Sequence, residues 1–146
     1  MRKSLLGLFA AFALVGMGTV AAHHSFDAEF DKDKPVIMKG KITRMDWINP
    51  HSWLYIDVAK DGKTEAWAIE FASPGTLISQ RGWTRDMIVI GQTVTVQGFL
   101  AKDGSLRSNG SRVDLQDGKQ LCASNCGADG KQRPEIGAVF AKLPQP

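Results

Sequence analysis

Three histidines are the residues of this sequence best suited to chemistry, and they occur in two places. His23 and His24 are adjacent, and His51 follows an Asn-Pro step between two tryptophans. If the chain is cut before His23, its new α-amino group and its imidazole can close one chelate ring around a metal ion. A third nitrogen, from His24 or His51, would complete the site, and these nitrogen ligands favour Cu(II) over Zn(II) and Ni(II). The sequence therefore predicts a candidate copper site at His23, His24 and His51.

Two simpler interpretations of the histidines stay open. His23 and His24 can belong to a frayed chain terminus, and His51 can cap its turn or stack between the neighbouring tryptophans. Proline fixes its own φ and moves the preceding residue out of the α region, so Asn49-Pro50 sets a turn. His51 leaves this turn in a defined direction. A metal site requires that this direction be toward the N-terminus of the cleaved chain.

The first 22 residues have the three parts of a secretory signal peptide. Arg2 and Lys3 provide the positive start, residues 5–15 form the apolar stretch, and small residues end it at Ala22. We therefore expect cleavage between Ala22 and His23, and a periplasmic or secreted protein. A membrane anchor is the alternative, but the apolar stretch is shorter than the roughly 20 residues that a spanning helix needs.

Charge narrows the class of partner. The chain has a formal net charge of +3, and removal of the two basic residues of the signal peptide lowers it to +1. No basic stripe remains for nucleic acid, and no later apolar stretch could span a membrane. We therefore expect an unknown small ligand or another periplasmic protein as the partner, and no nucleic acid.

Cys122 and Cys126 are expected to form a disulfide, because export places them in an oxidising compartment. Such a pair can also bind a soft metal ion as thiolates. No further sulfur ligand lies nearby in the sequence, so the disulfide is the favoured interpretation.

Alternating apolar residues predict the elements that must position these groups. Ser73-Pro74 begins a short helix that ends near Gly82. A change of phase in the first strand indicates a bulge near Gly40. We predict a mainly β, OB-fold-like five-stranded antiparallel barrel with one short helix between strands three and four, and a small β-sandwich as the alternative. The strands are expected at residues 36–47, 52–58, 65–71, 93–100 and 105–115.

The chain divides into four predicted parts. These are the signal peptide (1–22), an N-terminal arm anchored by Phe26 and Phe30 (23–35), the β-barrel domain (36–118) and a flexible, cysteine-containing tail with little to bury (119–146). The core is expected to contain Trp67, Ile69, Phe71, Val94, Val96 and Val113, with Leu77 of the helix closing one end.

Three aromatic residues near His51 offer a second type of site. Trp47, Trp53 and Tyr55 are candidates for the face on which an OB-fold binds oligonucleotides or sugars by stacking. The alternative is that they belong to the core, since a small domain needs most of its large apolar side chains inside.

Three motifs together carry a family resemblance: His23-His24-Ser25-Phe26, Asn49-Pro50-His51 and Arg81-Gly82-Trp83-Thr84. With Ser73-Pro74, they resemble a family of short exported bacterial proteins described as a domain of unknown function. The resemblance covers residues 23–118. It implies an exported single domain and no assigned activity.

These observations favour an exported, non-catalytic binding or accessory module of unknown ligand. The alternative is a periplasmic copper-handling protein that uses the three histidines, and an enzyme of unknown type ranks third. No G-x-S-x-G nucleophile motif occurs. Asp46, Asp57 and Glu70 are interpreted as surface charges rather than as a catalytic pair. Copper is the one cofactor that the sequence suggests.

Overall fold

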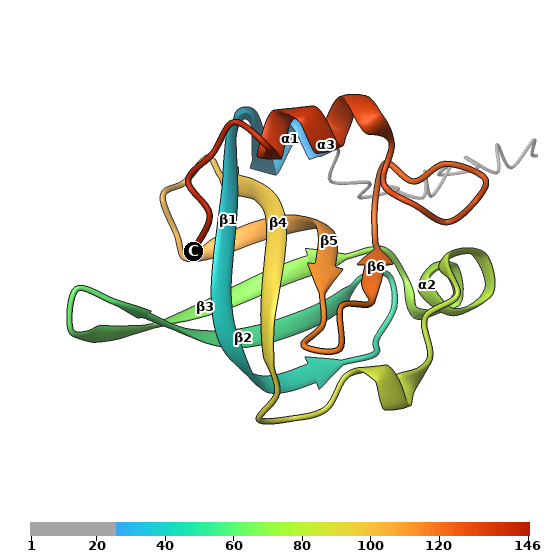
Figure 1. The fold of residues 1–146 in the computed structure, drawn as a ribbon, viewed down its shortest axis with the longest axis horizontal. Helices are drawn as coiled ribbons and strands as arrows, with labels where there is room; N and C mark the ends of the chain where they lie inside the picture. The colour runs from blue at the N-terminus through green and yellow to red at the C-terminus, as the bar shows by residue number, and fades with distance from the viewer. Residues whose placement is uncertain (1–25) are drawn as a thin grey trace, which may run out of the picture.

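The structure, a computed structural model, describes residues 26–146 (Figure 1). The predicted signal peptide and the candidate ligands His23 and His24 lie outside the described residues. Within residues 26–146, no helix is long and apolar enough to cross a membrane.

Strands dominate the described chain, and the helices are short. In chain order the elements are α1 (Phe26–Glu29), β1 (Phe30–Asp46), β2 (Ser52–Lys60), β3 (Lys63–Phe71), α2 (Pro74–Arg81), the 3-10 helix η1 (Arg85–Met87), β4 (Thr93–Ala101), β5 (Arg107–Asp114), β6 (Gln120–Cys122) and α3 (Pro134–Phe140).

The strand pairings close a ring in the order β1-β2-β3-β5-β4, which returns to β1. This barrel-like ring, with α2 between the third and fourth strands, confirms the predicted mainly β, OB-fold-like fold. Two details differ from the prediction. A sixth strand, β6, pairs with β5, and the β3–β5 pairing is parallel. The parallel pairing has a simple cause, because an odd number of strands cannot alternate in direction all the way round a ring.

β1 is a long strand that serves two partners in succession. It pairs with β4 from Phe30 to Lys41 and with β2 from Lys41 to Asp46. The predicted bulge is confirmed and lies between Ile42 and Arg44, shortly after Gly40. Gly40 marks the point where β1 passes closest to β2, because a Cβ atom there would lie 2.6 Å from the carbonyl oxygen of Asp57.

The core fills the ring, and the predicted core residues are buried together in it. Helix α2 closes one side as predicted: Ser73 caps it by accepting a hydrogen bond from the Thr76 amide, and Leu77 is fully buried. Trp83, just after the helix, is also fully buried and donates its indole N–H to the carbonyl oxygen of Cys122 at 2.8 Å. This bond ties α2 to the segment that follows β5.

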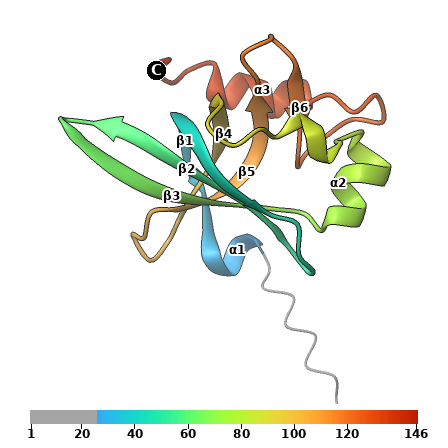
Figure 2. The same ribbon diagram turned by 90° about the horizontal axis from the view of Figure 1, so that it is seen from below.

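Residues 119–146 are predicted to form a flexible tail with little to bury, and the structure corrects the expectation about burial. β6 extends the sheet, and α3 packs over one end of the ring (Figures 1 and 2). Phe140 of α3 is fully buried, and its ring lies 5.3 Å from that of Phe99, centroid to centroid. Sequence patterning misses this because one aromatic residue on a short helix makes no periodic signal.

Cys122 and Cys126 form the predicted disulfide, and both are buried. Removing it with the double substitution Cys122→Ser, Cys126→Ser should lower the free energy of unfolding by less than about 2 kcal/mol, because the closed loop is short. Hydrogen exchange should accelerate in residues 121–133 and stay unchanged in β1 and β4. A loss of cooperative unfolding would show instead that the disulfide supports the whole ring.

Candidate functional site

His51 contacts Glu70 at one end of the ring. His51 lies in the turn between β1 and β2, and Glu70 lies near the end of β3. The β2–β3 register brings them together, because it places Trp53 directly opposite Glu70. Nδ1 of His51 lies 2.7 Å from Oε1 of Glu70. The side chain of Glu70 is 9% exposed and that of His51 is 36% exposed, so the carboxylate is the buried partner and the imidazole reaches the surface.

This contact determines which nitrogen of His51 is available. When the imidazole is neutral, a proton on Nδ1 faces the Glu70 carboxylate, and the lone pair of Nε2 is then available to a ligand. A histidine that ligates a metal commonly has its other nitrogen held in this way, which fixes the ring and increases its basicity. The pair is therefore suited to binding a cation or a hydrogen-bond donor at Nε2.

A cavity of about 230 Å³ lies beside the pair. Phe26 and Glu29 of α1 line it on one side, and Asn109 of β5 and Ser124 line it on another. The predicted anchors of the N-terminal arm both pack on the ring: Phe30 is buried, and the Phe26 ring lies edge-on to Phe99 at 5.6 Å. The start of the described chain thus lies at the same cavity as His51.

The charges at this cavity are mainly negative. Among residues 26–146, its lining contains two carboxylates, Glu29 and Glu70, and neither a lysine nor an arginine. Arg107 lies just outside and approaches Glu29 at 3.4 Å, and it also pairs with Asp103 at 3.2 Å. The lining therefore favours a cationic ligand over an anionic one.

Within residues 26–146, no group of three or more histidine, cysteine, aspartate or glutamate side chains is arranged to hold a metal ion. Of the three predicted ligands, the described part of the chain contains His51 alone. His23 and His24 precede it. The described residues therefore contain one of the three candidate ligands, His51, which contacts the Glu70 carboxylate.

The three candidate aromatic residues differ in their surroundings. Trp47 packs edge-on against Trp83 at 6.4 Å. The guanidinium of Arg44 covers the ring of Tyr55 at 3.8 Å. Trp53 is half-buried on β2 and lies opposite Glu70, the residue that contacts His51, in the β2–β3 ladder.

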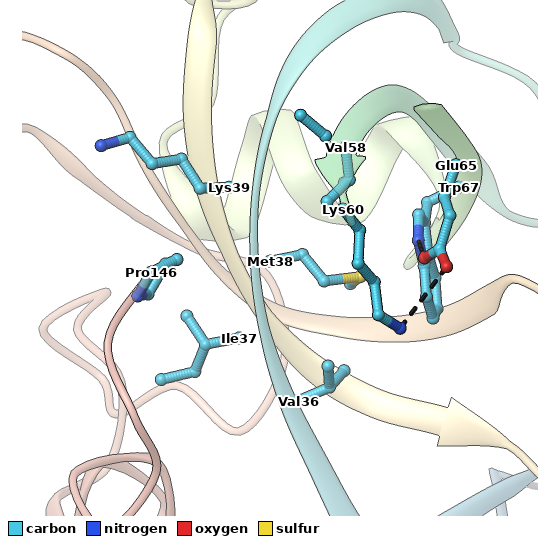
Figure 3. A pocket seen from close by; sticks show the side chains of 10 residues that line it. Val36, Ile37, Met38, Lys39, Val58, Lys60, Glu65, Trp67 and Pro146 are labelled. Atoms are coloured by element: carbon cyan, nitrogen blue, oxygen red, sulfur yellow. Dashed lines mark hydrogen bonds and ion pairs between the residues drawn. The ribbon is translucent and has the colours of Figure 1, made fainter. Parts of the chain in front are cut away.

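Sequence reasoning misses two features of the structure. Glu70 is interpreted there as a surface charge, whereas the structure buries it. The signal that could identify it is a lone carboxylate at the end of a strand rich in large apolar residues. The second missed feature is a larger groove of about 540 Å³ on another part of the surface, between β1 and the β2–β3 hairpin (Figure 3).

Comparison with known proteins identifies a family but no activity. A family model described as a family of unknown function (DUF6152) matches residues 12–111. The matched residues include the positions of the three motifs noted above, and the predicted resemblance to a family of unknown function is confirmed. No curated protein matches the chain.

Proposed function

This chain belongs to the family of unknown function DUF6152, and we propose that it is a non-catalytic binding module that works after export. The observation that carries the proposal is the His51–Glu70 pair, with Nδ1 and Oε1 at 2.7 Å beside a cavity. Such a pair fixes one imidazole nitrogen and leaves the other for a ligand. We place the binding site at this cavity.

A divalent metal ion, with copper favoured, is the ligand that this arrangement supports best. The carboxylate that holds His51 supports it, and so does the negative lining of the cavity. Chain length supports a contribution from the N-terminus as well. Phe26 lines the cavity, and the three peptide steps from His23 to Phe26 can span about 10 Å. The proposed ligands are Nε2 of His51, the amino group and imidazole of His23, and His24.

Catalysis by a protein nucleophile has less support. Both cysteines are in the disulfide. The hydroxyl of Ser124, which also lines the cavity, donates to the carbonyl oxygen of Gly110 at 3.2 Å. These contacts favour a role for these residues in lining a binding site over a role as nucleophiles.

The test compares two forms of the mature protein. Both begin at His23, and one of them carries an acetyl group on the α-amino nitrogen of His23. We expect acetylation to weaken Cu(II) binding by more than about 100-fold, because the amide nitrogen it creates no longer offers the lone pair of a free amine. Competition titration against a chelator of known affinity measures the difference. Equal Cu(II) affinity in the two forms would contradict the proposed amine ligand, and no binding by either would refute the metal site.

A further inference from the structure

β1 and the β2–β3 hairpin separate beyond the last pair of their ladder. That pair is Lys41 with Asp57. Within the described residues 26–146, residues 36–39 of β1 pair only with β4, and residues 58–60 of β2 pair only with β3. Figure 1 shows the hairpin extending past β1 on this side. The groove of about 540 Å³ lies between these two strand edges.

The backbone of β2 directs hydrogen-bonding groups into this groove. The hairpin turns through Asp61 and Gly62, which both have positive φ, so Lys60 and Lys63 form the hydrogen-bonded pair that closes it. The next pair, Ala59 with Thr64, is then a non-hydrogen-bonded pair, whose N–H and C=O groups point out of the hairpin. The backbone N–H and C=O of Ala59 therefore point toward β1, and those of Thr64 point to the opposite edge of the hairpin.

An independent contact supports this direction. The carbonyl oxygen of Tyr55 accepts a hydrogen bond from the Thr43 hydroxyl of β1 at 3.2 Å, so it points toward β1. Ala59 lies four residues further along β2 and has the same parity. Its amide and carbonyl therefore face the groove, and no strand of residues 26–146 pairs with them on this side.

The side chains of the groove suit an extended segment with one apolar face. Figure 3 shows Val36 and Met38 pointing from β1 toward the hairpin, where Trp67 lies. The indole N–H of Trp67 donates to Glu65 at 2.9 Å, so the ring is held in place. A strand inserted here would direct every second side chain onto this apolar floor.

We propose that this groove binds an extended, acidic segment of a partner protein, which adds to the edge of β2 as a strand. Lys39 lines one side of the groove and Lys60 the other. Lys60 is paired with Glu65 at 3.4 Å, whereas Lys39 has no ion-pair partner within residues 26–146. Lysines on an open edge oppose pairing with a second copy of the same edge, so their charge favours an acidic partner. This site needs neither His51 nor a metal ion.

The test uses two synthetic nine-residue peptides and the full exported chain. One peptide alternates valine with glutamate, and the other alternates valine with lysine. We expect the glutamate peptide to bind and the lysine peptide to bind at least tenfold more weakly, measured by calorimetry and by the change in tryptophan fluorescence. Failure of the glutamate peptide to bind at millimolar concentration, or equal binding of both peptides, would overturn the proposal.

Two matched proline variants test the strand edge. Ala59→Pro removes the backbone N–H that faces the groove. Thr64→Pro removes the backbone N–H of the residue opposite Ala59, which faces the other edge of the hairpin. We expect Ala59→Pro to weaken the glutamate peptide by about tenfold or more and Thr64→Pro to leave its affinity unchanged. An equal loss in both variants would refute docking at the β2 edge. If the protein alone forms a dimer and Ala59→Pro makes it monomeric, a second copy of the chain fills the groove. That result would refute an acidic partner.

A charge variant keeps the test decisive if a proline variant fails to fold. The variant is Lys39→Glu, because Lys39 lines the groove but lies outside the ladder between β1 and β2. We expect it to weaken binding of the glutamate peptide by about three- to fivefold, because the ion pair it removes is exposed, and to strengthen binding of the lysine peptide. If Lys39→Glu changes the affinity of neither peptide, the charge argument is overturned and the proposal with it.

Discussion

Replacing Phe71 with alanine should lower the free energy of unfolding by about 3–5 kcal/mol, a large part of the stability of a small domain. The side chain of Phe71 is 2% exposed, and its ring centroid lies 5.3 Å from that of Trp83. The ring also covers Gly110, where a Cβ atom would clash with Phe71 Cε1. The substitution therefore removes a ring from the middle of the core and leaves a cavity there.

Urea unfolding followed by tryptophan fluorescence measures this change. Ile90→Ala is the control, because Ile90 is 59% exposed and its truncation should change the free energy of unfolding by about 0.5 kcal/mol or less. Gly110→Ala should destabilise the protein by about 1–3 kcal/mol through overpacking, and by less in the Phe71→Ala background, where space is available. A Phe71→Ala variant as stable as the wild type would show that the core is assigned wrongly.

Replacing His51 with alanine should weaken Cu(II) binding by the mature protein by more than about 100-fold, because removing a ligand costs more than removing its supporting partner. Glu70→Gln should weaken it by about 10- to 100-fold, since the amide still accepts from Nδ1 but carries no charge. Glu65→Gln, the same substitution on the same strand but outside the cavity lining, is the control and should have no effect. Chelator competition measures all three. A Glu65→Gln effect as large as that of Glu70→Gln would contradict the specific role of Glu70.

The local elements of this fold could be predicted from the sequence because each leaves a local signal. Trp67, Ile69 and Phe71 alternate with smaller or polar residues, and this period of two is sufficient to direct them inward. Ser73-Pro74 at one end and Gly82 at the other define α2 through capping. The order of these elements then limits the fold to a few arrangements.

The site could be predicted only in part because its geometry depends on pairing between strands. His51 stands out by its type and by the turn before it. Its partner Glu70 is set by the β2–β3 register, which places Trp53 opposite that carboxylate, and no local pattern contains this information. The burial of Glu70 depends further on residues far away in the sequence, since Phe26 and Ser124 come to the same cavity. The same reason explains the missed packing of Phe140 against Phe99.

The most direct test of the proposed metal site is pulsed electron paramagnetic resonance of the Cu(II)-loaded mature protein, which begins at His23. The nitrogen couplings should show the N-terminal amine and more than one imidazole, and His51→Ala should lose one imidazole coupling and keep the amine. Identical spectra for the wild type and His51→Ala would contradict a role for His51 and leave binding to the terminal histidines alone.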